Sequence, residues 1–160
     1  MRQGDDSYID ETSKVAKAAI LRLRPLDENI QTAMEKIKND LQHELGHFHC
    51  PEEVNYQDRV TICDYGFTTY CTSEKHGVVF FQDTASANAL VPGMICTIFL
   101  VMQDSTQHIF LAVHRYLALA TSLPNPFAQY PDFSASLWSL EMQKEITIVL
   151  GNQNLYHAIY

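Results

Sequence analysis

Hydrophobic and polar residues repeat with one spacing up to about residue 50 and with a different spacing after about residue 58. In the first part, apolar residues recur every three or four positions, which is the spacing of one buried helix face. In the second part, β-branched and aromatic runs alternate with glycine, proline and polar residues, as strands do between turns. We therefore predict a flexible tail over residues 1–12, a helical segment over residues 13–50 and a β-rich domain over residues 58–160. Residues 13–160 should form one folding unit.

Two helices are expected in the N-terminal segment. Ser13 is a suitable N-cap for the first helix, which Pro25 should stop. The apolar stripe of this helix comprises Val15, Ala19 and Leu23. Asp27 offers an N-cap for the second helix, because a carboxylate there can accept hydrogen bonds from the backbone N–H groups of the first turn. The stripe of the second helix comprises Ile30, Ala33, Met34, Ile37 and Leu41.

From Val60 onward the pattern predicts strands. The stretch "VTICDYGFTTYCTSEKHGVVFFQD" should form strands broken at Gly66 and at residues 73–77, and "EITIVL" and "LYHAIY" should close the fold around the turn "GNQN". Two longer strands flank the polar turn "QDSTQ". In the second of them, apolar residues occupy both alternating sets of positions, so both faces should be at least half covered. The two sets are Ile109, Leu111 and Val113, and Phe110, Ala112 and His114.

Closely spaced strands after a helical lead-in indicate an α+β fold. We expect two N-terminal helices packed on a mostly antiparallel, barrel-like β-sheet. A doubly wound parallel sheet is not expected, because no strand alternates with a helix after residue 58.

Composition narrows the classes of partner. Of the 160 residues, 46% are apolar and 19% charged, which is an ordinary globular balance, and the formal net charge is −8. Nucleic-acid phosphates repel an acidic chain unless it segregates a basic patch. The cations after Pro51 are scattered: Arg59, Lys75, Arg115 and Lys144. We therefore expect no direct nucleic-acid binding. We expect no membrane association either, since the longest apolar run, "TIFLVM", has the length of a strand.

The stretch "NDLQHELGHFHC" contains "HELGH", which matches the H-E-x-x-H signature of zinc metalloproteases. In that signature, two histidines one helical turn apart bind zinc, and the glutamate acts on a metal-bound water. His43 and His47 have the required spacing, and Glu44 lies between them. A zinc-dependent metallohydrolase that uses these three residues is therefore one hypothesis for the function.

Three observations argue against this zinc site. On a helix, Leu45 and Phe48 continue the apolar stripe, so the two histidines of the motif should face solvent, where no packed shell would hold a metal. Gly46 is suited to close the helix at Leu45, which would leave His47 outside it. Only helix precedes the motif, whereas zinc proteases place a sheet there, and no third ligand stands at a metzincin spacing. We therefore expect no stoichiometric zinc.

The chain has four cysteines: Cys50, Cys63, Cys71 and Cys96. They form no C-x-x-C pair, and "MRQGDDSYIDE" does not resemble a secretory leader, so we interpret them as reduced thiols inside the cell. Most free cysteines fill small core positions. As an alternative, Cys71 could form a nucleophilic pair with His76. Cys63 could do so with His114, although the spacing requires neither pair.

Aromatic residues gather around two loops: Tyr65, Phe67, Tyr70, Tyr130, Phe133 and Trp138. A small barrel can present such rings as a cage for methylated lysine or as a peptide groove. Rings can instead fill the core and plug the end of the barrel, which is the interpretation we favour. We accordingly expect the proline-rich segment from Pro124 to Trp138 to be tied to the body by its rings. The binding alternative would use Tyr65, Phe67, Tyr130, Phe133 and Trp138.

Four stretches follow one another in a recognisable order: "YGFTTYCTSEKHGVVFFQD", "VPGMICTIFLVM", "HIFLAVHRYLAL" and "NPFAQYPDFSASLWS". In this order they resemble a β-rich segment near the end of long fungal open reading frames associated with transposable elements, and of their solitary relatives. The similar positions run from Tyr65 to Tyr160. The resemblance implies a β-domain of unassigned function, carries over no catalytic residue and gives "HELGH" no role.

These observations predict a non-catalytic interaction module inside the cell, in the cytoplasm or the nucleus. We expect a protein partner and no cofactor. The resemblance suggests a nuclear or transposon-derived complex as the setting. The alternative is the zinc-dependent metallohydrolase built on "HELGH".

Overall fold

The computed structural model describes residues 22–83, 89–120, 122–132, 137–152 and 154–157. Its helices are α2 (Glu28–Lys36) and α3 (Lys38–Leu45), with a short 3-10 helix η1 (Glu74–His76). The strands are β1 (Leu23–Pro25), β2 (Glu53–Gln57), β3 (Arg59–Ile62), β4 (Tyr65–Thr68), β5 (Val78–Asp83), β6 (Ala89–Gln103), β7 (Thr106–Ala118), β8 (Trp138–Leu150) and β9 (Tyr156–His157). This is the predicted α+β class.

Strand β6 is the centre of an antiparallel sheet. Along one edge it pairs with β7, which in turn pairs with β8. Its other edge is shared, because β5 pairs with its first half and β2 with its second half. Strand β9 continues the sheet beyond β5, and β1 continues it beyond β2. Strands β3 and β4 form a separate two-stranded hairpin.

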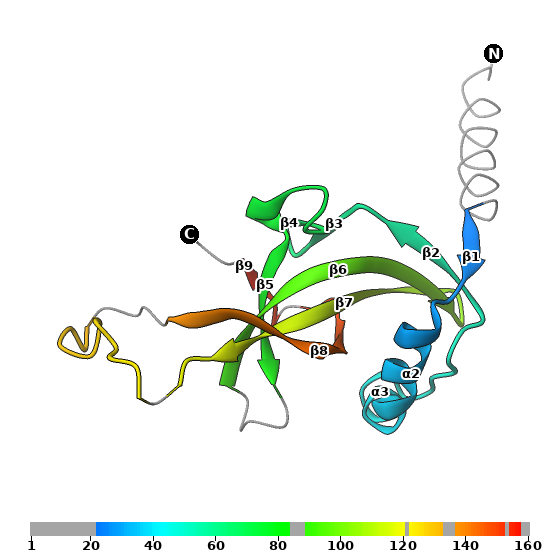
Figure 1. Cartoon of the computed structure of the whole chain (residues 1–160). Coiled ribbons are helices and arrows are strands. Elements are labelled where there is room, and N and C mark those ends of the chain that lie inside the picture. Colours follow the sequence, from blue (N-terminus) through cyan, green and yellow to red (C-terminus); the bar gives the residue numbers. More distant parts are fainter. Residues whose placement is uncertain (1–21, 84–88, 121, 133–136, 153, 158–160) are drawn as a thin grey trace, which may run out of the picture.

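The sheet is open, which corrects the barrel-like expectation. Within the described residues, β8 pairs only with β7, and β9 pairs only with β5. The ladder is therefore not closed between β8 and β9, although the sheet is strongly curved (Figure 1). The alternating pattern of the sequence determines which side chains face inward, but it does not determine whether the last strand meets the first.

Two tight turns connect neighbouring strands, one between β6 and β7 and one between β3 and β4. Asp104 and Ser105 join β6 to β7 with φ values of 50° and 63°, as a tight two-residue hairpin turn requires, and this confirms the predicted "QDSTQ" turn. Cys63 and Asp64 join β3 to β4 in the same way, with φ values of 49° and 67°. The predicted break at Gly66 is wrong, because Gly66 lies inside β4 opposite Thr61.

Two buried clusters lie on opposite faces of β6 and β7. Phe110 and Ala112 belong to the cluster beneath the helices, whereas Leu111 and Val113 belong to the cluster beneath the β3–β4 hairpin. In Figure 1 the helices lie below the arc of these strands and the hairpin lies above it. The prediction that both faces of the second long strand are covered is confirmed.

A β-bulge at Cys96 sets which residues of β6 face each cluster. The register shifts between Ile95 and Thr97, so that Cys96 is the additional residue. Before the bulge, Ile95 contributes to the hairpin-side cluster, and after it Ile98 does so, although an uninterrupted strand would turn Ile98 to the other face. The bulge thus lets Phe99 and its cross-strand partner Phe110 stack in the helix-side cluster, with ring centroids 5.5 Å apart.

The second predicted helix is present, in two pieces. The carboxylate of Asp27 accepts hydrogen bonds from the backbone N–H groups of Asn29 and Ile30, at 2.9 and 3.3 Å, which confirms the N-cap. The helix is interrupted at Ile37, where φ is −105° and ψ is 10°. The predicted stripe is buried or half-buried against the sheet: Ile30, Ala33, Met34, Ile37 and Leu41.

The first predicted helix lies mostly outside the described residues, as does the predicted tail. Its final part is wrong, because Leu23–Pro25 form β1 and pair with β2. Strand β2 itself belongs to the main sheet, although it precedes residue 58, where we expected the β-rich domain to begin. Long-range pairing thus draws part of the predicted helical segment into the sheet.

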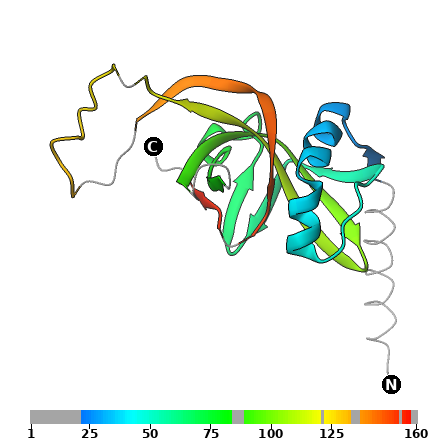
Figure 2. The ribbon, with the colours of Figure 1, turned by 90° about the horizontal axis from the view of Figure 1, so that it is seen from below.

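Only part of the predicted anchoring of the segment between β7 and β8 is present among its described residues. Its described part extends away from the sheet in both views (Figures 1 and 2). Tyr130 has 58% of its surface exposed, and Phe127 is only half-buried. Trp138 is half-buried against the hairpin-side cluster, and Phe133 lies outside the described residues. The rings of this segment, where described, therefore do not plug the end of the fold.

Candidate functional site

The structure does not place the "HELGH" residues as a zinc protease needs them. His43 and Glu44 are exposed on α3, which ends at Leu45, and Gly46 follows with φ of 78°. His47 therefore lies beyond the helix and is also exposed, so both sequence predictions about this motif are confirmed. Within the described ranges, no group of three His, Cys, Asp or Glu side chains is placed to hold a metal ion. The expectation of no stoichiometric zinc stays a prediction that elemental analysis would check.

The side chain of Gln103 forms hydrogen bonds with the loop that follows α3. Its side-chain amide nitrogen donates a hydrogen bond to the backbone carbonyl of His47, and its amide oxygen accepts one from the backbone N–H of His49 at 3.4 Å. Between them, Phe48 is fully buried, with its ring 5.9 Å from that of Phe110. Gln103 at the end of β6 thus holds the loop that inserts Phe48 into the core. The sequence contained no signal for this contact across 56 residues.

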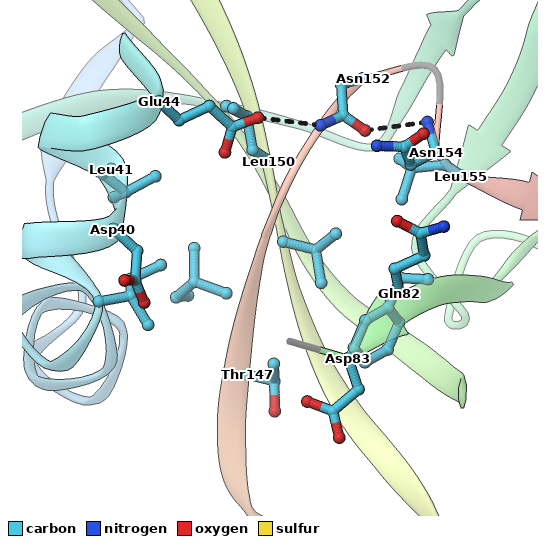
Figure 3. A pocket seen from close by; sticks show the side chains of 14 residues that line it. Asp40, Leu41, Glu44, Gln82, Asp83, Thr147, Leu150, Asn152, Asn154 and Leu155 are labelled. Carbon is cyan, nitrogen blue, oxygen red and sulfur yellow. Dashed lines mark hydrogen bonds between the residues drawn. The ribbon is translucent and has the colours of Figure 1, made fainter. Parts of the chain in front are cut away.

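A cavity of about 480 Å³ lies where the open sheet fails to close (Figure 3). We call it the seam groove, and its lining residues are Ile37, Asp40, Leu41, Glu44, Phe81, Gln82, Asp83, Thr147, Ile148, Val149, Leu150, Asn152, Asn154 and Leu155. Strands β5 and β8 are separated in the sheet by β6 and β7, yet both line this groove. The sheet therefore curls enough to bring β5 and β8 to one cavity, with α3 beside it.

Strand β8 directs backbone groups into the seam groove at an edge that pairs with no strand of the described ranges. The N–H of Gly151 donates to the carbonyl of Ile109 at 2.7 Å. This bond shows which facing residues of β7 and β8 form hydrogen-bonded pairs. Because hydrogen-bonded pairs alternate along an antiparallel ladder, Thr147 and Val149 also direct their backbone groups to β7. Ile146, Ile148 and Leu150 therefore direct their N–H and C=O groups away from β7, toward an edge that carries no strand in the described part of the chain.

The charged side chains that line the seam groove are all negative. The lining residues include three carboxylates and no lysine, arginine or histidine. Asp83 is neutralised by Arg115, whose guanidinium lies 2.7 Å from its carboxylate. Glu44 accepts a hydrogen bond from the side-chain amide of Asn152 at 3.3 Å, and Asp40 is exposed. The α3 side of the groove thus carries two negative charges without a neighbouring cation in the lining.

The candidate binding aromatics separate into two places. Phe67 is buried and stacks on the imidazole of His157, with centroids 4.5 Å apart, and the exposed ring of Tyr65 contacts His157 edge-on at 5.6 Å. His76 reaches the same imidazole at 5.6 Å. Trp138 begins β8 and is half-buried against the hairpin-side cluster, and its buried ring N–H has no hydrogen-bond partner among the described residues. No single cage collects the described members of this set.

Two of the four cysteines have thiols that are poorly suited to nucleophilic chemistry. Burial raises the pKa of the Cys96 thiol, which donates to the carbonyl of Ala112 at 3.0 Å. Burial and the nearby Glu35 carboxylate raise the pKa of Cys50 as well. A raised pKa lowers the fraction of reactive thiolate. Cys63 and Cys71 are exposed, and within the described residues neither is hydrogen-bonded to its proposed histidine.

No protein-family model, no curated protein and no solved structure matches this chain. The resemblance to the fungal transposon-associated segment therefore stays a prediction. Each helix in the described ranges is too short or too polar to cross a bilayer.

Proposed function

We propose that this chain is a non-catalytic protein-interaction module that binds an extended peptide at the edge of β8, in the seam groove. Peptides often bind by adding a strand to an exposed sheet edge, where backbone hydrogen bonds supply affinity and side-chain pockets supply specificity. The observation that carries the proposal is the row of outward backbone groups at Ile146, Ile148 and Leu150 beside a cavity that both apolar and polar side chains line. Its volume of about 480 Å³ lies within the usual range of binding sites.

The composition of β8 supports a partner at its C-terminal half. Natural proteins protect open edges with charged residues or proline. The exposed first half of β8 has such protection in Glu141, Lys144 and Glu145. The second half, "ITIVL" from Ile146 to Leu150, has none. An uncharged, regularly paired edge that is not covered by the described chain is suited to accept a further strand.

A proline substitution tests this edge. Leu150→Pro removes an outward N–H but leaves the hydrogen bonds to β7 intact, and proline is tolerated at such edge positions. Leu150→Ala is the matched control, because it removes the same side chain and keeps the N–H. We expect a fluorescent peptide of alternating valine and serine to bind the wild type and the alanine variant similarly. Binding to the proline variant should be about five-fold weaker, from the loss of about 1 kcal/mol for one hydrogen bond.

Fluorescence anisotropy measures this binding, and circular dichroism checks that both variants fold. Equal peptide binding by the two variants would contradict the proposal, as would no binding by the wild type at millimolar peptide. Sedimentation tests a different occupant. A wild-type dimer that Leu150→Pro converts to a monomer would show that a second copy of the chain covers β8 in place of a peptide.

A further inference from the structure

We infer that the peptide bound in the seam groove is basic, with lysine or arginine at alternate positions facing Asp40 and Glu44. This inference rests on the proposed function and specifies its partner. The chain is acidic overall, and the groove lining contains carboxylates but no cation. Figure 3 shows Asp40 and Glu44 on the helix beside β8, with the amide-bearing residues Gln82, Asn152 and Asn154 on the other side of the groove. Positive charge on the helix side of a bound strand would therefore meet two carboxylates.

The helical segment runs alongside β8, as two contacts show. At one end, the Lys36 ammonium lies 3.8 Å from the Glu145 carboxylate. At the other end, the Glu44 carboxylate accepts the hydrogen bond from Asn152. A strand added to β8 would therefore extend along α3 for several residues, with Asp40 and Glu44 in succession beside it.

The spacing of the two carboxylates fits a strand. Residues four apart on a helix are separated by about 6 Å along its axis. Residues two apart on a strand are separated by about 6.6 Å and share one face. Basic residues at positions i and i+2 of the peptide would therefore align with Asp40 and Glu44. The pair at i and i+3 would place its two side chains on opposite faces of the strand.

Apolar residues should occupy the intervening positions. The other face of an added strand would lie toward Phe81, Val149 and Leu155, which belong to or pack against the hairpin-side cluster. On the α3 face, the hydrocarbon stem of lysine or arginine can pack along Leu41 while its charged end reaches a carboxylate. The groove thus favours the repeat basic–apolar–basic–apolar.

Fluorescent peptides with the same length distinguish the requirements. They are Val-Lys-Val-Lys-Val, the rearranged Lys-Val-Val-Lys-Val, Val-Ser-Val-Ser-Val and Val-Glu-Val-Glu-Val. At physiological salt we expect the alternating lysine peptide to bind about four-fold more tightly than the serine peptide, since each of the two exposed ion pairs contributes a factor of about two. The rearranged peptide should bind more weakly than the alternating one, and the glutamate peptide most weakly.

Matched double variants locate the charge that is recognised. Asp40→Asn with Glu44→Gln should abolish the preference for lysine over serine, and glutamine can still accept the hydrogen bond from Asn152. Glu53→Gln with Glu74→Gln changes the net charge equally at exposed positions outside the groove and should keep the preference.

The possible results separate this inference from the proposed function. If the Asp40 and Glu44 variant keeps the preference, or the control variant loses it equally, the inference is wrong. If the lysine and serine peptides bind the wild type equally, the inference is also wrong, while strand addition stands. If none of the peptides binds the wild type, the proposed function fails, and the inference fails with it.

Discussion

The two faces of the β6–β7 pair are covered in different ways. The helix cover, which consists of α2 and α3, comes from a single stretch of chain and is completed by the buried ring of Phe48. The hairpin cover, on the other face, combines the β3–β4 hairpin with β9, which is almost 90 residues further along the chain. The stacking of Phe67 on His157 joins these two parts. A helix satisfies its backbone hydrogen bonds internally, so it can cover a face using neighbouring residues alone. The strand cover requires partners that are distant in sequence.

Deleting Leu111 should have the largest effect, because β7 pairs regularly with both β6 and β8 at this position. Every residue of β7 on one side of the deletion would turn to the opposite face, so that Ala112 and Val113 would exchange clusters. We expect this variant to lack a cooperative thermal transition by circular dichroism. Deleting Cys96 is the control, because it removes only the additional residue of the bulge, so that the other residues of β6 keep their partners on β7 and the variant should still fold. A Leu111 deletion that melts like the Cys96 deletion would show that strand alternation does not set the two faces.

Substituting one buried ring on each face should compare the covers directly. Phe110→Ala should destabilise the protein by about 4 kcal/mol, because the ring contacts both Phe48 and Phe99. Phe67→Ala should cost about 3 kcal/mol, since the hairpin that carries it can relax into the space. Denaturant titration measures both values. Hydrogen exchange should show faster opening of β3, β4 and β9 in the Phe67 variant, with α2 still protected. Uniform opening in both variants would mean that the covers unfold as one unit.

Acid should weaken the hairpin cover more than the helix cover, with a smaller effect. Burial lowers the pKa of His157 below its ordinary value of 6.5, and the adjacent His76 adds to this, while the Gly66 backbone opposes it. The ring of Tyr65 also contacts His157 edge-on. Because the unfolded chain then binds a proton more readily than the folded one, stability should fall as the pH drops through and below 6.5.

His157→Phe tests this pH dependence, because it keeps a ring to stack on Phe67 and removes the titrating group. Thermal melting between pH 5 and 8 should depend less on pH in this variant than in the wild type. His43→Gln, at an exposed position on α3, is the control and should keep the wild-type profile. The same profile in all three proteins would exclude His157 as the source.

Local signals predicted the helix cover well. The apolar stripe, the Asp27 cap and the stop at Gly46 each act within one or two helical turns, so sequence spacing is enough to recognise them. The hairpin cover was less predictable. The turn at Cys63 and Asp64 has positive φ at two residues that are not glycine, so Gly66 was a misleading signal.

The candidate site was the least predictable part. Asp40 and Glu44 were visible as polar residues of α3, yet the sequence did not indicate that Ile148, Phe81 and Leu155 would lie around one cavity with them. The aromatic residues were conspicuous in the sequence, but their separation into a Phe67 cluster and an extended β7–β8 segment depended on contacts between distant parts of the chain.

The sequence by itself determined the α+β class, the capped helix, the long β6–β7 hairpin and the solvent-facing histidines of "HELGH". Periodicity, capping and turn chemistry act over a few residues, so these features are encoded locally. Only the tertiary structure decided that the sheet stays open, that β1 and β2 join it, and that Gln103 holds the loop around Phe48. These outcomes depend on the curvature and register of paired strands, through which residues more than 50 positions apart come into contact. The open seam, and the peptide site proposed there, follow from that geometry.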